Sequence, residues 1–390
     1  MRKIAFFCIP AHGHTNPTLG VVRELVRRGH QVRYYSFDLM REKIEAAGAE
    51  FVSCEPYMAE PDLDKDQQEQ VGNDIALAAR LLVDTTLALD EMISSQLREW
   101  QPDCIVADSM ALWGKAAARK LNVPFVSSTT TFAFNRYSAR VMKGSLKDLF
   151  GLLLKAPRAN REIRRLRNRG YPIKSFMDIL QNDDSVHTVV YTSPEFQPCS
   201  DTFSDKYVFV GPSVRPAETE LEQSGKKLIY ISMGTVVSCP ELYRNCVQAL
   251  RDLDCQVIFS LGDHVQASEL GQLPDHMKAY PRVDQMAVLA RADLFLTHCG
   301  MNSVNESLWS SVPMVLFPRT REQEGVANRT EELGAGLRLE ETSPEAIRAA
   351  VERVLNDPSY RENAHRLGRS FRDCPGAAGA ADKILSVCRA

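Results

Sequence analysis

Short apolar runs alternate with helix-like stretches along the whole chain, and this alternation predicts the fold class. The first half begins with a run from Lys3 to Ile9, followed by a helical stretch from Pro17 to Arg28 and a run from Val32 to Ser36. Runs of this kind are typical of strands in a parallel sheet, with the intervening helices covering its faces. The second half restarts the alternation at Leu228 to Ser232. The sequence therefore predicts an α/β protein with two Rossmann-like, doubly wound domains.

A polar segment separates the two halves. Residues 211–227 read GPSVRPAETELEQSGKK, with two prolines and two glycines, which is typical of an interdomain linker. We expect one domain over residues 1–210, the linker over 211–227 and a second domain over 228–372, with residues 373–390 forming a final helix. At 390 residues and 44% hydrophobic content, the chain can fill two cores.

Charge and composition argue against several classes of protein. The net charge is −3, from 47 basic and 50 acidic residues, so nucleic acid is not an expected partner and membrane contact is not expected. The first nine residues are too short for a signal peptide and no apolar run approaches membrane-spanning length, so we expect a cytoplasmic protein. Ten cysteines without a C-x-x-C pair argue against a zinc ribbon or a disulfide framework. We expect a monomer or weak dimer.

The junction around Gly300 has the composition of an anion site. It joins a predicted strand at residues 292–296 to a predicted helix at 304–309 through small and polar residues. Backbone N–H groups at a helix start favour a phosphate, Gly300 allows close approach, and His298, Asn302 and Ser303 add side-chain donors. Ser303-x-x-Glu306 has two interpretations. It is either a capping box or a carboxylate one helical turn from the phosphate, where it suits a sugar diol.

A second candidate site lies in the first half. Asn16 is a favourable N-cap and Pro17 suits a first helical position, so residues 12–15 should form a loop after the first strand. Asp108 ends a predicted strand at 104–107, and ligands collect at the carboxyl ends of such strands. His14, in the predicted loop, could meet Asp108 at this edge of the sheet. An imidazole paired with a carboxylate can remove a proton near neutral pH. Alternatively, His14 is a loop histidine that caps a backbone group. His12-x-His14 also resembles a metal pair but falls short of the three ligands usual for zinc.

Several motifs at fixed spacing together resemble a known family. The chain reads H-C-G-M-N-S-x-x-E from His298, V-P-M at residues 312–314, Glu322-Gln323, and A-N-R at 327–329. This order is similar to the donor signature of family 1 glycosyltransferases of the bacterial macrolide glycosyltransferase type, and it covers nearly the whole chain. The resemblance implies the GT-B fold, with two Rossmann-like domains facing across a cleft and a last helix returning to the first domain.

The resemblance also implies an activity. Such a protein is an inverting, metal-independent glycosyltransferase that needs no cofactor beyond its nucleotide sugar, and we expect UDP-glucose as donor. The acceptor would be a hydroxyl of a hydrophobic small molecule such as a polyketide, flavonoid or macrolide. Alternatives are a nucleotide-sugar epimerase or hydrolase of the same fold, or a non-catalytic partner of a glycosyltransferase. A dinucleotide oxidoreductase is disfavoured because no G-x-G-x-x-G follows the first strand.

The resemblance assigns roles to individual residues. His14 becomes the base and Asp108 its partner. The donor-binding residues it implies, from diphosphate to ribose to sugar, are Gly234, Thr235, His298, Gly300, Asn302, Ser303, Glu306, Glu322 and Gln323. Relatives often read W-x-P-Q where this chain has Arg282, Val283, Asp284 and Gln285, so Arg282 takes the aromatic position. A guanidinium plane can stack on a base.

Aromatic and basic residues of the first half remain open to more than one interpretation. Phe132, Phe134, Tyr137 and Phe150 could line an apolar acceptor pocket or belong to the core. Residues 155–169 carry one lysine and six arginines. The simplest interpretation of this run is the solvated face of a helix, and contact with lipid headgroups or an acidic acceptor is the lesser alternative. Arg321, next to the Glu322-Gln323 pair, is either a solvated charge or an aid to an anionic donor.

Overall fold

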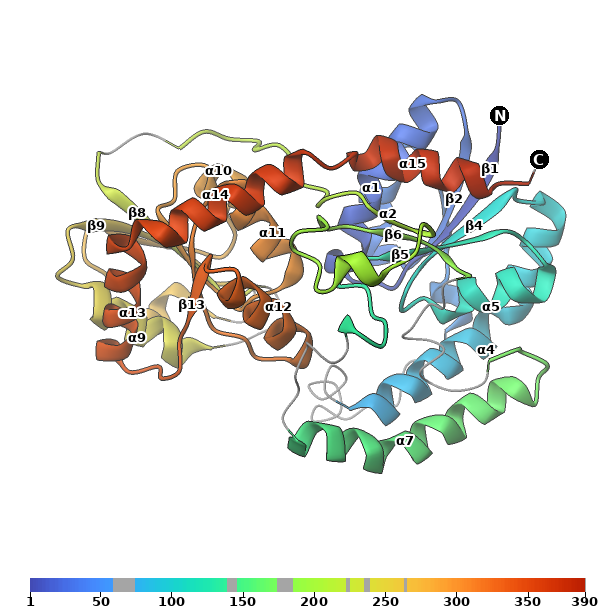
Figure 1. The fold of residues 1–390 in the computed structure, drawn as a ribbon, viewed down its shortest axis with the longest axis horizontal. Coiled ribbons are helices and arrows are strands. Elements are labelled where there is room, and N and C mark those ends of the chain that lie inside the picture. The colour runs from blue at the N-terminus through green and yellow to red at the C-terminus, as the bar shows by residue number, and fades with distance from the viewer. Residues whose placement is uncertain are drawn as a thin grey trace. The chain divides into compact units, whose positions relative to one another are not determined.

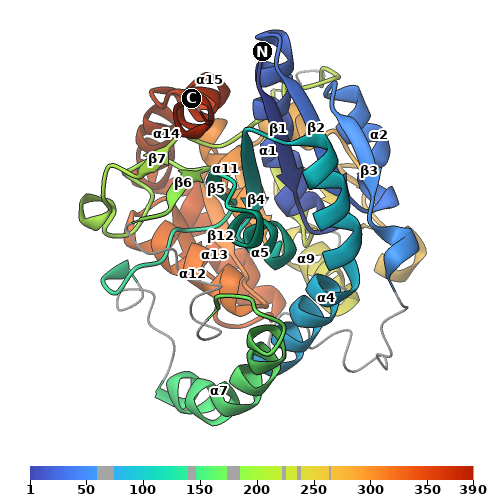
Figure 2. The same cartoon turned by 90° about the vertical axis from the view of Figure 1, so that its right-hand side faces the viewer.

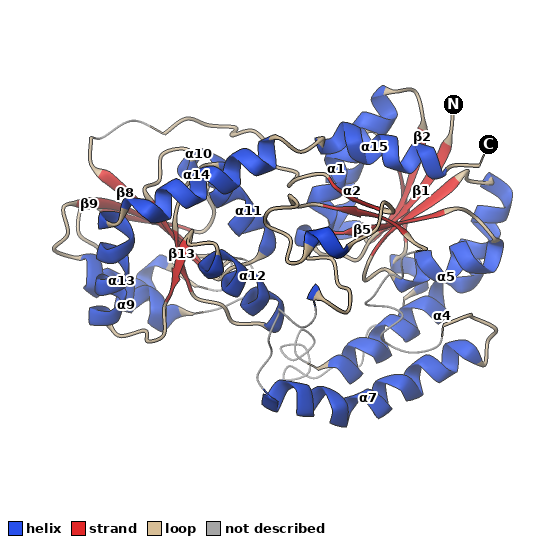
Figure 3. Ribbon diagram, viewed as in Figure 1, coloured by secondary structure: helices blue, strands red, loops and turns tan. Residues whose placement is uncertain are grey.

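The computed structural model describes residues 1–58, 74–138, 146–173, 185–221, 225–234, 239–262 and 265–389, with side chains of the helix at 146–167 described from residue 157. The chain divides into two compact units, Met1–Ser213 with Cys374–Ala390, and Val214–Asp373. Each unit contains one parallel β-sheet with helices on its faces (Figure 1, Figure 3). The predicted α/β class with two doubly wound sheets is confirmed.

The first unit holds a seven-stranded sheet in the order β3-β2-β1-β4-β5-β6-β7. Its strands are β1 Lys3–Phe7, β2 Gln31–Ser36, β3 Glu50–Ser53, β4 Cys104–Asp108, β5 Phe125–Thr129, β6 His187–Val190 and β7 Tyr207–Phe209. The chain winds outward in one direction from β1 and in the other from β4. These two strands are paired in parallel with Phe7 opposite Ala107, so their carboxyl ends meet at the topological switch point, where ligands bind in such sheets.

Helices cover both faces of this sheet (Figure 2). They are α1 His12–Arg27, α2 Arg41–Ala46, α4 Ile75–Trp100, α5 Leu112–Leu121, α7 Leu146–Arg167 and α15 Gly376–Val387, with short 3-10 turns at Asp38–Met40, Glu55–Tyr57 and Ser200–Thr202. One core packs α4, α5 and α7 on the sheet through residues such as Phe7, Leu112 and Ile163. The other packs α1 and α15 through residues such as Phe6, Val22 and Ile384.

The start of α1 differs from the sequence prediction. The helix begins at His12 with Ala11 as N-cap, and Pro17 lies inside it, so residues 12–15 are helical and Asn16 is not the cap. The physical reason is tertiary. His14 hydrogen-bonds across to Asp108, and the Thr15 hydroxyl bonds to Cys8 and Ile9. These contacts extend the helix by a turn ahead of a proline, at the cost of one backbone hydrogen bond.

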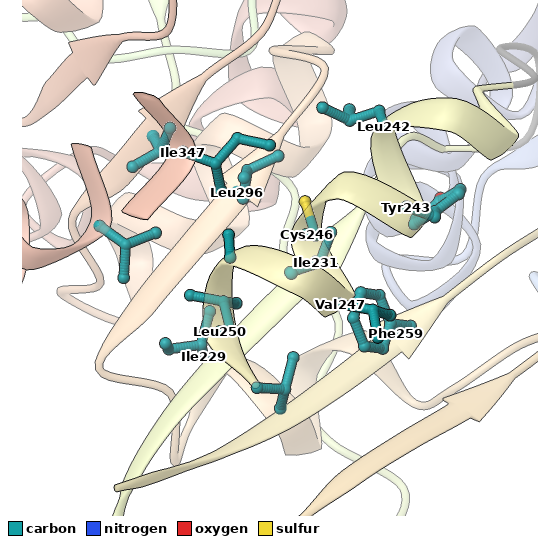
Figure 4. Packing of buried hydrophobic residues seen from close by; sticks show 14 of the residues in the cluster. Ile229, Ile231, Leu242, Tyr243, Cys246, Val247, Leu250, Phe259, Leu296 and Ile347 are labelled. Atoms are coloured by element: carbon teal, nitrogen blue, oxygen red, sulfur yellow. The ribbon is translucent and has the colours of Figure 1, made fainter. Parts of the chain in front are cut away.

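The second unit holds a six-stranded parallel sheet in the order β10-β9-β8-β11-β12-β13. Its strands are β8 Lys227–Ser232, β9 Cys255–Ser260, β10 Met277–Tyr280, β11 Leu294–Thr297, β12 Met314–Leu316 and β13 Gly336–Arg338. Its helices are α9 Pro240–Leu250, α10 Gln285–Leu289, α11 Met301–Trp309, α12 Arg321–Glu332, α13 Pro344–Asn356 and α14 Pro358–Arg372, with a 3-10 turn at Ala267–Leu270. Tyr243, Val247 and Leu250 of α9 pack on Ile231 and Phe259 of the sheet (Figure 4).

The switch point of the second sheet lies between β8 and β11. The two strands are paired with Thr297 opposite Ser232, so the loop that continues to Gly234 emerges beside the loop from His298 to Gly300. Loops at such a point are the expected place for a nucleotide. Within the part of the chain that the structure describes, no helix is both long and apolar enough to cross a membrane.

Candidate active site

An imidazole and a carboxylate pair at the switch point of the first sheet. His14 Nδ1 lies 2.9 Å from Asp108 Oδ2. The side chain of Asp108 is completely buried and that of His14 is 18% exposed. The other oxygen, Asp108 Oδ1, accepts the backbone N–H of Met110 at 2.9 Å. A buried carboxylate beside Nδ1 favours the tautomer that carries its proton there, which leaves Nε2 with a lone pair that can accept a proton.

Thr130 is a third member of this group that the sequence analysis missed. Its hydroxyl lies 3.1 Å from His14 Nδ1, so two oxygens surround the same ring nitrogen. Thr130 directly follows β5, which is paired with β4, and so it lies at the same edge of the sheet as Asp108. That adjacency is the only signal in the sequence that could have found it, and it needs the strand order to be known first.

Two other titratable groups, the Cys8 thiol and the His12 imidazole, lie close to His14 in the chain. Burial and the nearby charge of Asp108 raise the pKa of the Cys8 thiol far above its usual range, so this sulfur stays protonated and unreactive. His12 Nδ1 lies near Lys43 Nζ, at 3.3 Å. Among the described residues, no group of three or more His, Cys, Asp or Glu side chains is arranged to hold a metal ion.

The predicted anion site in the second unit is a helix start without a capping side chain. Gly300 is the N-cap of α11 and the first helical residue is Met301. Cys299 adopts a positive φ of 67°, which turns the chain sharply between β11 and the helix. Asn302 and Ser303 lie in the first turn, where backbone N–H groups and the helix dipole favour an anion. The capping-box interpretation of Ser303 and Glu306 is wrong, because the helix begins before Ser303.

His298 lies between two glycines at this helix start. A Cβ atom on Gly234 would lie 2.6 Å from His298 Cε1, and one on Gly300 would lie 2.6 Å from Nε2. Gly234 also has a φ of 72°, which favours glycine. Burial lowers the pKa of His298 to about 4, so the ring is neutral at pH 7. Its Nδ1 atom is buried and has no hydrogen-bond partner among the described residues, a state that a bound ligand could relieve.

Glu306 lies further along α11 and is held by a neighbour. Gln285 Nε2 donates to Glu306 Oε2 at 2.6 Å, and the Tyr230 hydroxyl donates to Gln285 Oε1 at 2.9 Å. Burial raises the pKa of Glu306. The structure therefore brings together Gln285 and Glu306, which the sequence analysis placed in the donor site, and adds Tyr230, which it did not identify.

The segment before α10 is fixed by Asp284. Its Oδ2 atom accepts the backbone N–H groups of Glu218 and Thr219 at 2.6 and 3.0 Å. This contact ties the start of the second unit to the loop that carries Arg282 and Val283. Arg282 is exposed and Val283 is partly buried. The sequence analysis treated Asp284 only as part of a motif, whereas the structure gives it a clear structural role.

Glu322 and Gln323 lie at the start of α12. Gln323 forms a capping box with Thr320, since Gln323 Oε1 accepts the Thr320 N–H at 3.2 Å and the Thr320 hydroxyl accepts the Gln323 N–H at 3.4 Å. Glu322 and Arg321 are exposed. A direct contact of the Glu322-Gln323 pair with a sugar stays a prediction.

The predicted acceptor residues differ in their surroundings. Phe132 is buried and packs on Phe196, with ring centroids 5.3 Å apart, which favours a core role. Phe134 is partly buried, and Tyr137 is exposed beside Arg136. Thr235 and the side chain of Phe150 lie outside the described residues.

The chain matches known glycosyltransferases along its whole length. The family described as UDP-glucoronosyl and UDP-glucosyl transferase matches residues 210–378. An uncharacterized UDP-glucosyltransferase of Bacillus subtilis, YojK, is 32% identical over 100% of this chain and 98% of its own. The oleandomycin glycosyltransferase of Streptomyces antibioticus is 28% identical over 98% of this chain and 90% of its own. The crystal structure of a calicheamicin glycosyltransferase superposes with a TM-score of 0.82 at 29% identity, covering 99% of this chain and 98% of that one.

Together the two sheets, their switch points and these matches define a nucleotide-sugar-dependent glycosyltransferase with the GT-B fold. The chain belongs to the family 1 UDP-glycosyltransferases and is related to the bacterial enzymes that glycosylate macrolides and other natural products.

Proposed function

We propose that this enzyme transfers glucose from UDP-glucose to a hydroxyl group of a hydrophobic small molecule, with inversion at the anomeric carbon. The observation that carries the proposal is the pair formed by His14 and the buried Asp108. The name of the UDP-glucosyltransferase relative supports the donor. The names of the oleandomycin and calicheamicin enzymes support a natural-product acceptor.

The proposed reaction is a single displacement. Nε2 of His14 takes the proton of the acceptor hydroxyl as its oxygen forms a bond to the anomeric carbon. The bond from that carbon to the diphosphate oxygen breaks, and UDP leaves with the electron pair. Asp108 accepts the Nδ1 proton in a hydrogen bond throughout and stabilises the imidazolium. One displacement inverts the configuration, and no residue is needed as a covalent nucleophile.

The donor is proposed to bind at the start of α11. N–H groups of its first turn would receive the diphosphate, whose negative charge grows as the bond breaks, and fixed dipoles stabilise such charge without a metal. His298 Nδ1, which is buried without a partner among the described residues, would gain one from the nucleotide sugar. Glu306 would accept hydrogen bonds from the ribose.

The test is to separate transfer from binding. His14→Ala should abolish glucosyl transfer while UDP still binds, and near wild-type turnover in this variant would refute His14 as the base. Wild-type enzyme is incubated with UDP- and dTDP-sugars and a diverse aglycone library, with products read by mass spectrometry and anomeric configuration by NMR. A retained configuration would exclude the single displacement. Donor consumed equally fast without any acceptor would favour a hydrolase or epimerase.

A further inference from the structure

Three side chains from three elements of the second unit form a hydrogen-bonded chain. Tyr230 of β8 donates to Gln285 Oε1, and Gln285 Nε2 donates to Glu306 Oε2, over 2.9 and 2.6 Å. A carboxamide whose oxygen accepts from a phenol must turn its NH₂ group the other way, here towards Glu306. The opposite orientation would place the amide oxygen against a carboxylate. The orientation of Gln285 is therefore set by Tyr230.

Tyr230 is well suited to act as a fixed donor. Its side chain is buried, and its ring stacks on Phe295 with centroids 4.6 Å apart. Burial raises the pKa of its phenol well above the usual range, so the hydroxyl keeps its proton near neutral pH. The phenol O–H therefore stays available as the donor to Gln285 Oε1.

The amide in turn favours the ionised state of Glu306, against the effect of burial. Burial is the largest effect on its pKa and raises it, and the hydrogen bond from Gln285 lowers it. Two other charged groups act on this carboxyl: Arg215 lowers its pKa and Asp284 raises it. If the Tyr230 hydroxyl were absent, Gln285 could rotate and present its oxygen, which favours the protonated form of Glu306.

We propose that Tyr230 is a positioning residue for nucleotide recognition, which acts through Gln285 to keep Glu306 ionised and so sets a preference for ribose over 2′-deoxyribose. The inference rests on the proposed function, in which Glu306 faces the ribose. An ionised carboxylate makes a stronger hydrogen bond to a hydroxyl than a neutral carboxyl does. Loss of one such bond lowers affinity by about 10- to 100-fold.

The experiment compares UDP with 2′-deoxy-UDP as ligands of the full-length enzyme. Dissociation constants are measured by calorimetry for wild type, Tyr230→Phe and Glu306→Gln. Tyr360→Phe is the matched control, since Tyr360 is another buried tyrosine of the second unit. Wild type should prefer UDP by about tenfold or more. Tyr230→Phe should reduce that preference at least fivefold while the affinity for 2′-deoxy-UDP changes less than twofold, and Tyr360→Phe should keep the wild-type ratio.

The pH profile gives a second measurement that a purely structural role would not alter. Glu306 is ionised above its pKa, so the affinity for UDP should fall as the pH drops through that pKa. We call this fall in UDP affinity at low pH the acid limb. In Tyr230→Phe the acid limb should move to higher pH, and in Tyr360→Phe it should stay at the wild-type pH. Gln285→Met should lose the preference for UDP, and adding Tyr230→Phe to it should have no further effect.

The outcomes separate the inference from the function on which it rests. A folded Tyr230→Phe variant with an unchanged ratio and acid limb overturns the role of Tyr230. If Tyr230→Phe does not fold, Gln285→Met decides, and an unchanged UDP preference in that variant overturns the inference. If wild type fails to bind UDP, or Glu306→Gln keeps the wild-type ratio, the proposed ribose contact itself is wrong.

Discussion

At the scale of single residues, the proposed chemistry depends on which nitrogen of His14 carries the proton. Asp108 and Thr130 both present oxygens to Nδ1. The carboxylate of Asp108 can only accept and so favours a proton on that atom, whereas the Thr130 hydroxyl can accept or donate. A base built in this way needs a carboxylate, because an amide can donate to Nδ1 and reverse the tautomer. The sequence indicated the pair, whereas Thr130 could be found only once the pairing of β4 with β5 was known.

Asp108→Asn should therefore separate catalysis from binding. We expect turnover to fall about 100-fold or more, in line with the usual contribution of general base catalysis, while the dissociation constant for UDP stays unchanged. Steady-state kinetics and calorimetry measure the two quantities. A variant that keeps more than a tenth of wild-type turnover would show that the carboxylate is not required.

His298, which we propose as a donor-site residue, also affects stability at acid pH. Its pKa is lowered from 6.5 to about 4 by burial, so the unfolded chain binds a proton that the folded chain does not, and stability falls as the pH drops from 6.5 towards 4. Between pH 7 and pH 5 this effect amounts to about 2 kcal/mol. His298→Gln should remove it, so urea denaturation should show a smaller loss of stability for the variant. An equal loss in both proteins would contradict the buried neutral imidazole.

At the scale of elements, the start of α11 and the loop after β8 fit around one imidazole. Gly300 has an ordinary φ of −60°, so alanine is compatible with its backbone. The difficulty with alanine there is the 2.6 Å approach of a Cβ atom to His298 Nε2. The requirement for glycine thus comes from packing, which no local sequence rule could reveal.

Gly300→Ala should weaken UDP binding about tenfold or more, because the new methyl group displaces His298. The built-in control is the double variant. His298→Ala removes the imidazole ring, and with it the clash between the ring and a methyl group at residue 300. Adding Gly300→Ala to His298→Ala should therefore cost no further affinity for UDP. Calorimetric titration of the three variants tests this. Additive losses would show that Gly300 acts independently of His298.

Element boundaries show where local signals suffice. The apolar runs at Val32–Ser36 and Leu228–Ser232 are observed as the strands β2 and β8, each beginning one residue earlier, because a continuous apolar run of this length is typical of a buried strand. The elements β10, β13 and α10 were missed, since three to five residues cannot establish a period. Asn16-Pro17 is a strong local start signal, yet the contacts of His14 and Thr15 moved the start of α1 to His12. Tyr230 was indistinguishable from core because its partners come from distant segments.

At the scale of the whole molecule, the C-terminal helix packs on a different unit from the one that precedes it in the chain. The helix α15 directly follows the second unit in sequence but belongs to the first. Ile384 of this helix is buried together with Ile4 and Phe6 of β1.

Ile384→Ala should lower the free energy of unfolding of the first unit by about 2–5 kcal/mol through the cavity it leaves. The affinity of the second unit for UDP should not change. Ile347→Ala is the matched control, because Ile347 is buried in the core of the second unit. Hydrogen exchange read separately for β1 and β8 distinguishes the two effects. Reduced protection of β8 in Ile384→Ala would contradict the assignment of α15.

The position of α15 has a consequence for synthesis in the cell. Residues 214–373, which form the second unit, must all be translated before α15 can reach β1. At about 5–20 residues per second, that delay is roughly 8–32 s. During this time α1 covers its part of this side of the first sheet, but the apolar residues that α15 buries, such as Ile4 and Phe6, lack that part of their cover. The emerging chain therefore presents an apolar surface of the kind that ribosome-associated chaperones bind.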